Sequence, residues 1–319
     1  MAWGDASHRT HRLSTNHVHR RLMITHNGTY LLHATHHGMP IVAATMGGKM
    51  VIGYGLLSAT RQAIVAAFGA EGTEVIRKTN DYLNRIATTD PQRALLIAGF
   101  INEDPMIAPY FIQGGELKYY LSGKDDLING AWVDRINSAV KWLPQGSCTR
   151  AENGYLLNGD NGNLKANDAL LYDLGNHFRA MAEFTTTTDS YVVIDFGSIT
   201  GASKNISFQT GKNNGQYINM NWKMQGNNSN PGVQIDMPVP AGHHYFTWAI
   251  VDAGNGYDKF VASIDGVTQE TAGIIPKATN FGGYKNWENK DFYIGRGVAS
   301  GYAMSNGGII HNFMIHVID

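Results

Sequence analysis

The acidic residues nearest the predicted strands decide whether this sequence could hydrolyse a sugar. They are Glu183, Asp195, Asp236, Asp252 and Asp258. Glycoside hydrolysis needs two carboxyl groups that flank one bond, roughly 5–9 Å apart. Each of these acids stands isolated in its stretch of sequence, so the spacing indicates no catalytic pair. A glycosidase is therefore the less favoured interpretation.

Other catalytic and metal-binding motifs are missing as well. The sequence has no G-x-S-x-G motif, and "NGDNGN" (158–163) lacks the carboxylates of a calcium loop. The glycine-rich "GGKMVIGYG" (47–55) matches neither phosphate-binding pattern. The single cysteine, Cys148, allows no intrachain disulfide and fits a reducing compartment. We expect no catalytic residue, no cofactor and no metal, and hence no enzyme.

Composition and charge indicate a turn-rich β protein. Charged residues make up 16% of the 319 residues, and there are 37 Gly, 15 Tyr, 12 Phe and 6 Trp. A net charge of −1 gives no field that would attract nucleic acid, so no specific nucleic-acid partner is expected. No stretch reaches the ~18 apolar residues of a membrane span, and no membrane association is expected. The first residues have no apolar core typical of a secretory signal.

Residues 1–47 differ in composition from the rest of the chain. Eight of the 13 histidines lie here, with Arg9, Arg12, Arg20 and Arg21 against one acid, Asp5. Such a segment has too few large apolar residues to offset its ordering entropy alone. We predict an extended arm that docks on partner subunits. His-His and His-x-x-His pairs without cysteine or carboxylate neighbours are a weak metal signal, and a metal site is the alternative.

Residues 48–114 are predicted to form a helical anchoring segment. Ser58 and Thr73 are candidate N-caps, Gly69 is a candidate stop, and Asp90-Pro91 is typical of a helix start. The third helix is apolar on almost every side from Ala94 onward, which predicts packing against a neighbouring domain or another subunit.

Residues 115–319 change to alternating strands separated by Asn, Gly, Ser and Asp. The predicted strands cover 178–185, 191–197, 205–211, 216–224, 245–252, 259–265, 291–297 and 309–318. Short strands without intervening helices are typical of an antiparallel sandwich or jelly roll. The fold class is therefore mainly β, with a C-terminal jelly-roll sandwich after the arm and the helical segment.

The stretch "HHYFTWAIVDAGNGYDKFVASIDGV" (243–267) resembles the laminin-G and concanavalin A-like pattern of strand, turn, strand and closing Asp-Gly. "DFYIGRG" (291–297) and "GGIIHNFMIHVID" (307–319) are similar to the closing strands of that family, and 131–164 to its entry strands. The resemblance covers about 116–319 and implies a jelly roll. The E-x-D-x-x-E arrangement of the sandwich glycosidases is missing, which leaves a binding role.

Two loops could form a sugar site of the kind such sandwiches use. The loop 282–291 offers Tyr284 and Trp287 beside Asn286 and Asn289, and Trp222 precedes the loop 223–232. Aromatic faces supply apolar area and amides supply orientation. The alternative is that Trp287 and Trp222 are core residues and the asparagines only form turns.

As a whole, the chain resembles virion proteins of crAss-like gut phages in style, with a short basic start and a C-terminal concanavalin A-like domain. This implies a non-enzymatic head decoration, head-fibre or tail component that assembles in the host cytoplasm. Its expected partners are other capsid, fibre or tail subunits, copies of itself, and a host-surface glycan. A free carbohydrate-binding protein is the alternative.

Overall fold

The computed structural model describes residues 18–24, 30–36, 39–46, 49–53, 55–157, 162–167, 177–186, 193–197, 205–210, 217–223, 233–238, 240–270, 275–276, 292–295 and 307–318. The chain divides into two compact units, 1–113 and 114–319. This division falls next to the expected boundary between 48–114 and 115–319. No helix among the described residues is both long and apolar enough to span a membrane.

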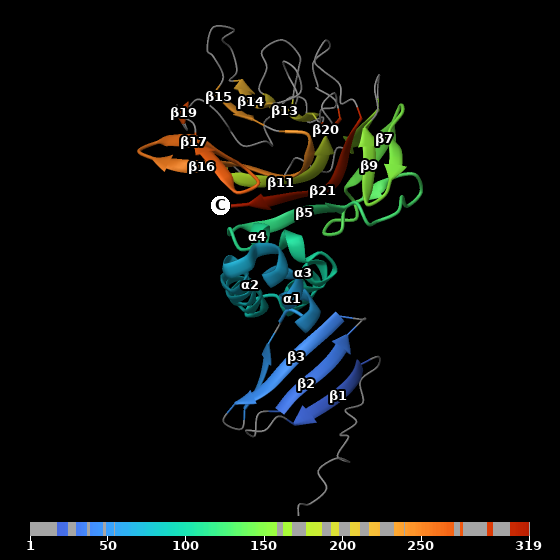
Figure 1. Cartoon of the computed structure of the whole chain (residues 1–319), viewed down its shortest axis with the longest axis vertical. Helices are drawn as coiled ribbons and strands as arrows, with labels where there is room; N and C mark the ends of the chain where they lie inside the picture. Colours follow the sequence, from blue (N-terminus) through green and yellow to red (C-terminus); the bar gives the residue numbers. More distant parts are fainter. Residues whose placement is uncertain are drawn as a thin grey trace, which may run out of the picture. The chain divides into compact units, whose positions relative to one another are not determined.

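The first unit begins with a four-stranded antiparallel sheet in the order β1-β2-β3-β4 (Figure 1). Its strands are β1 (Val18–Ile24), β2 (Tyr30–His36), β3 (Met39–Met46) and β4 (Lys49–Gly53). The extended arm expected over 1–47 is therefore wrong for these strand residues, and the first six residues of the expected helical segment also belong largely to this sheet. Arg20 and Arg21 lie in β1, whereas Arg9 and Arg12 lie outside the described residues.

Two residues separate β2 from β3, and two separate β3 from β4. His36 pairs with Met39 and Met46 pairs with Lys49, so the connections span two residues each. The residues at those connections are His37-Gly38 and Gly47-Gly48.

Helices α1 (Ser58–Phe68), α2 (Gly72–Ala87), α3 (Pro91–Glu103) and the short α4 (Ala108–Phe111) complete this unit, with 3-10 turns η2 (Gly69–Glu71) and η3 (Pro105–Ile107). The Asp90 side chain accepts a hydrogen bond from the Arg93 N–H, which confirms the predicted cap. Gly69 ends α1 with φ +55°, also as predicted. Ser58 and Thr73 are not caps, because α1 and α2 begin after Leu57 and Glu71 without a side-chain cap.

The second unit is built from strands β5 to β21. They are β5 (Glu116–Ser122), β6 (Trp132–Val133), β7 (Lys141–Gln145), β8 (Thr149–Ala151), β9 (Gly154–Leu157), β10 (Asn163–Ala166), β11 (Phe178–Thr186), β12 (Val193–Gly197), β13 (Asn205–Thr210), β14 (Tyr217–Lys223), β15 (Val233–Pro238), β16 (Gly242–Gly254), β17 (Tyr257–Ile264), β18 (Val267–Glu270), β19 (Ile275–Pro276), β20 (Phe292–Ile294) and β21 (Gly308–Val317). Each of the eight strands predicted from alternation is present, within a few residues of its expected bounds.

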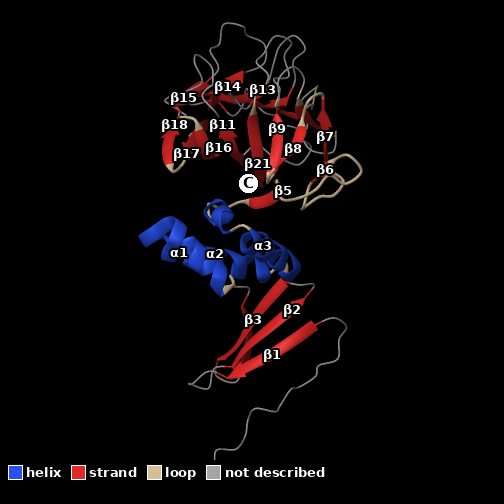
Figure 2. Cartoon of the chain, turned by 45° about the vertical axis from the view of Figure 1, so that its right-hand side comes forward, coloured by secondary structure: helices blue, strands red, loops and turns tan. Residues whose placement is uncertain are grey.

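These strands form two antiparallel sheets that face each other within the unit (Figure 2). The eight-stranded sheet has the order β15-β14-β13-β12-β20-β10-β7-β6. The nine-stranded sheet follows β18-β17-β16-β11-β21-β9-β8, with β19 on β17 and β5 on β21. The protein is thus mainly β, as predicted.

One core joins the two sheets. Trp142, Leu164 and Ile294 enter it from the eight-stranded sheet, and Phe178, Trp248 and Phe313 are among those that enter from the nine-stranded sheet. Trp142 packs edge to face on Phe313, with 5.8 Å between the ring centres. Phe178 packs in the same way on Trp248, with 5.3 Å between the ring centres. This packing fixes the sheets on which the candidate site is built.

The Asp265-Gly266 pair forms the predicted tight turn. Ile264 pairs with Val267, and the two residues between them have φ of +48° and +85°. Asp265 also accepts a hydrogen bond from the Tyr245 N–H at 2.9 Å through its carboxylate. The turn is therefore tied to strand β16 as well as to its own hairpin.

Candidate functional site

Alternation along β11 separates core residues from those on the outer face of the nine-stranded sheet. Phe178, Ala180, Ala182 and Phe184 belong to the core. Residues of the opposite set, Glu183 and Thr185 among them, lie on the outer face. His243 and Tyr245 lie opposite them on β16, since Thr185 pairs with His243 and Glu183 with Tyr245. We call His243, Glu183, Thr185, Tyr245 and His311 the His243 cluster.

Glu183 is the buried centre of this cluster. It is only 8% exposed, and its Oε1 lies 2.7 Å from His243 Nε2. Its Oε2 accepts a hydrogen bond from Asn312 Nδ2. Asn312 is itself buried, and its Oδ1 accepts a longer bond of 3.5 Å from the Tyr120 hydroxyl. Both carboxylate oxygens of Glu183 are therefore already engaged.

The environment of Glu183 keeps its carboxyl group ionised. Burial acts to raise the pKa of Glu183, but hydrogen bonds from His243 and Asn312 and the charges of His243 and His311 outweigh it and lower the pKa. A carboxyl with a lowered pKa and both oxygens engaged is a poor proton donor. Glu183 can orient His243, but it is unsuited to act as a general acid.

A β-bulge places His311 beside this pair. On β11, Glu183 is opposite Asn312 and Phe184 is opposite Ile310, which leaves His311 as the extra residue of β21. Its Nδ1 lies 2.7 Å from the Asn153 carbonyl oxygen and its Nε2 lies 2.8 Å from Thr185 Oγ1. A carbonyl only accepts, so Nδ1 carries the proton and holds the ring in one orientation.

The exposed part of the cluster contains the rings of His243, Tyr245 and His311. The His243 side chain is 44% exposed. Its ring meets Tyr245 edge to face at 5.0 Å and lies 5.3 Å from the His311 ring. Thr185, Tyr245 and His311 are half-buried. The His243 ring is therefore partly exposed beside the half-buried Tyr245, Thr185 and His311.

His244 points away from this face and braces the nearby turn. It is 4% exposed and lies 5.7 Å from the Phe184 ring. Its Nδ1 lies 2.7 Å from Asp265 Oδ2, and its Nε2 lies 2.7 Å from the Pro240 carbonyl oxygen. The two adjacent histidines of the sequence therefore serve opposite faces of one strand.

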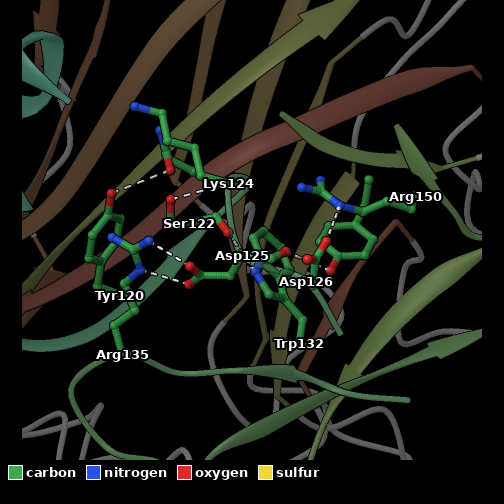
Figure 3. A network of polar contacts seen from close by, with 10 residues as sticks. Tyr120, Ser122, Lys124, Asp125, Asp126, Trp132, Arg135 and Arg150 are labelled. Carbon is green, nitrogen blue, oxygen red and sulfur yellow. Dashed lines mark hydrogen bonds and ion pairs between the residues drawn. The ribbon is translucent and has the colours of Figure 1, made fainter. Parts of the chain in front are cut away.

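Tyr120, whose hydroxyl donates to Asn312, belongs to a network of polar contacts around the loop that follows β5 (Figure 3). Arg135 donates two hydrogen bonds to Asp125, at 2.7 and 2.5 Å, and its guanidinium lies 5.3 Å from the Tyr120 ring centre. The Trp132 indole N–H donates to the Ser122 carbonyl at 2.8 Å. These contacts hold Tyr120 in place. Tyr120 donates to Asn312, which in turn donates to Glu183.

Asp134 holds the same loop through hydrogen bonds from backbone N–H groups. Burial raises the pKa of Asp134 to about 7, although backbone N–H bonds from Asn137, Ile136 and Tyr120 oppose the shift. Those three donors lie 2.7 to 2.9 Å from its oxygens. At 2% exposure it is a structural residue and not a group that meets a ligand.

The lowered pKa of Glu183 predicts a pH effect on stability. Its folded pKa is below the unfolded value of about 4.3, so its contribution is fully present above about pH 4.3 and is lost as pH falls through the folded pKa. Glu183→Gln should therefore flatten the acid limb of the stability curve, measured by urea unfolding at a series of pH values. The exposed Glu152→Gln is the control. An unchanged acid limb in Glu183→Gln would contradict this assignment.

The structure does not test the sugar site predicted from the sequence. Tyr284, Asn286, Trp287 and Asn289 lie outside the described residues. Trp222 lies in β14, where its Cα pairs with Ile206 and Val233, but its side chain is outside the described part. These residues remain predictions. Among the residues that the structure does describe, no group of three or more His, Cys, Asp and Glu is arranged to hold a metal ion.

The sequence carried only a faint signal for the His243 cluster. Glu183 is the one acid in "FRAMAEF" at the start of β11, where Arg179 is the only other charged residue. In β16, "HHY" follows the first residue, Gly242. A buried carboxylate in a strand requires hydrogen-bonding partners. That requirement could have directed attention to a neighbouring strand with histidines, but not to a particular one.

Comparisons with known proteins return only distant structural similarity. No protein-family model matches the chain, and no curated protein matches it. The chain is similar to a Trypanosoma rangeli sialidase in complex with 2,3-difluorosialic acid, at 12% identity and a TM-score of 0.43, over 93% of this chain and 42% of the other. It is also similar to the binding domain of botulinum neurotoxin DC in complex with SialylT, at 12% and 0.44, over 64% and 48%.

A third similarity is to the carbohydrate recognition domain of Emp46p in its potassium-bound form, at 9% identity and a TM-score of 0.38, over 55% of this chain and 88% of the other. The chain thus spans less than half the length of the sialidase and toxin structures. At these scores the similarities do not define a ligand or an activity, and the site must be interpreted from its own geometry.

Proposed function

We propose that this chain is a non-enzymatic virion structural protein whose C-terminal sandwich contacts host-surface glycans. The observation that carries the glycan role is the His243 cluster. The rings of His243 and Tyr245 are partly exposed and in contact, and Glu183, which accepts a hydrogen bond from Asn312, holds His243 in place. Ring faces with a few oriented hydrogen-bonding groups are what a sugar-binding surface requires.

The state of Glu183 favours binding over hydrolysis. Hydrolysis of a glycoside needs a proton donor with a raised pKa and a second carboxylate facing the same bond. Glu183 has a lowered pKa and donates nothing, because both of its oxygens accept hydrogen bonds. Its geometry supports a brace for His243 in a binding surface.

The virion role is supported by the two-unit organisation of the chain. Residues 1–113 and 114–319 are separately compact, so one unit could attach to capsid, fibre or tail subunits while the other displays the sandwich. The style of the sequence, which is similar to crAss-like phage virion proteins, points the same way. Self-association would multiply weak glycan contacts through avidity. A free carbohydrate-binding protein is the second candidate.

Mass spectrometry of purified particles separates these two candidates. The virion proposal expects the chain to be present at a fixed ratio to the major shell protein after density-gradient purification. A chain found only in the soluble fraction of the lysate would support the free carbohydrate-binding protein.

His243→Gln tests the glycan role. Glutamine keeps an N–H donor for Glu183 but removes the ring, so the fold should persist and glycan binding should weaken at least about tenfold, which is about 1.4 kcal/mol. Binding is measured on a glycan array and then by calorimetry with the best ligand. Leu143→Ala, an exposed change on the other sheet, is the matched control and should bind normally. Equal binding by His243→Gln would remove the cluster as the site.

A further inference from the structure

We infer that the His243 cluster takes an uncharged glycan, such as a neutral hexose or an N-acetylhexosamine, and discriminates against sialic and uronic acids. This inference rests on the proposed glycan role and adds the chemical class of the ligand. It depends on the partners of the ring nitrogens that the structure describes in His243, His244 and His311, because an anionic sugar needs an uncompensated positive charge.

His243 supplies no such charge. Its Nε2 faces the Glu183 carboxylate at 2.7 Å, so this nitrogen is the one that carries a proton. The pair then has a net charge of zero if the ring is protonated on both nitrogens, and of minus one if it is neutral. In either state Glu183 compensates any positive charge of the ring, and when the ring is neutral the buried carboxylate would repel a ligand carboxylate.

The hydrogen-bond partners of His311 fit a neutral ring. Its Nδ1–H is directed at the Asn153 carbonyl, and the Thr185 hydroxyl can donate to Nε2 at 2.8 Å. Both nitrogens therefore have complementary partners without a second proton. The ring also lies 5.3 Å from His243, so two positive charges at these positions would repel each other.

His244 is directed away from the exposed face and is opposed by a carboxylate. Both of its ring nitrogens face oxygen acceptors, from Asp265 and from Pro240. Any positive charge on the ring is matched by the Asp265 carboxylate at 2.7 Å. With His311 neutral, these three imidazoles and the carboxylates that face them have a net charge of zero or below.

An uncharged sugar fits a cluster whose positive charges are compensated. Its hydroxyl and acetamide groups can both donate and accept hydrogen bonds, and its apolar ring face can stack on an aromatic ring. It also brings no charge close to Glu183. The cluster is therefore suited to orientation of a neutral ring and not to capture of a carboxylate.

The test uses an array of matched glycan pairs, such as lactose with sialyllactose and N-acetylglucosamine with glucuronic acid, applied to the full chain. The neutral member should bind at least about tenfold more tightly. Its affinity should change little when ionic strength rises from about 0.05 to about 0.5 M, because screening acts on charges. His243→Gln should lose this binding, and Leu143→Ala should keep it.

The outcomes separate the inference from the proposed function. Tighter binding of sialyllactose or glucuronic acid that weakens with salt and depends on His243 would overturn the neutral-ligand inference and leave the glycan role intact. No binding of any member of the array by the full chain would overturn both. Neutral binding that survives His243→Gln would place the site elsewhere and overturn the inference for this cluster.

Discussion

Replacing Asp258 with alanine is expected to lower the free energy of unfolding by about 3–5 kcal/mol. Asp258 is 3% exposed and His177 is 9% exposed, and Asp258 Oδ1 lies 2.8 Å from His177 Nε2. Removing one partner leaves the other polar group buried next to a cavity. The pair also joins the start of β11 to β17 within the nine-stranded sheet. Urea unfolding at neutral pH measures the change.

Asp126→Ala is the control for this prediction. The Asp126 side chain is 98% exposed, and its contact with Arg150 is at 4.0 Å, so stability should change by no more than about 0.5 kcal/mol. If Asp258→Ala behaves like Asp126→Ala, the buried pair does not stabilise the fold as described.

Gly123→Ala is expected to cost at least about 2 kcal/mol and to reduce glycan binding as well. Gly123 follows β5, and a Cβ there would overlap the carbonyl oxygens of Asn153 and His311. Those are backbone atoms that cannot turn aside. Asn153 is also the acceptor that fixes the His311 ring, so a shift of the backbone would disturb the His243 cluster.

Thermal unfolding and glycan-array binding of Gly123→Ala should therefore change together. Lys124→Ala changes the next residue, whose side chain is exposed, and should leave both measurements close to those of the unaltered chain. A stable Gly123→Ala variant with normal binding would mean that the turn after β5 relaxes without moving Asn153.

The strands of the sandwich could be predicted because their local signals agree with the fold. Apolar and polar residues alternate along β11 and β16, and Asp265-Gly266 tolerates the positive φ that a two-residue turn requires. Asp90 before Pro91 is a local helix signal of the same kind. In each case the deciding interaction lies within a few residues.

The sheet of β1 to β4 could not be predicted from composition, because residues 1–47 are rich in histidine and arginine and poor in large apolar residues. β1 (VHRRLMI) and β2 (YLLHATH) show no regular alternation of apolar and polar residues that would indicate strands. Pairing between neighbouring strands satisfies backbone N–H and C=O groups of these strands.

The candidate site could not be predicted, because its members are distant in sequence. Glu183 lies 60 residues from His243 and 129 from Asn312. Only the register of β16 and β21 on β11, together with the bulge at His311, brings them together. A shift of one residue in either pairing would move His243 or Asn312 to the core face.

Strand β21 follows every other described strand in the chain, yet it lies within its sheet between β11 on one side and β5 and β9 on the other. During synthesis, the edges of β5, β9 and β11 that pair with β21 therefore stay unpaired until β21 emerges from the ribosome. Until then the core also lacks Phe313 and Ile315. Contacts such as Tyr120 to Asn312 close a span of 192 residues. Such long closures fold slowly and expose aggregation-prone edges meanwhile, so the yield of native sandwich depends on late folding events.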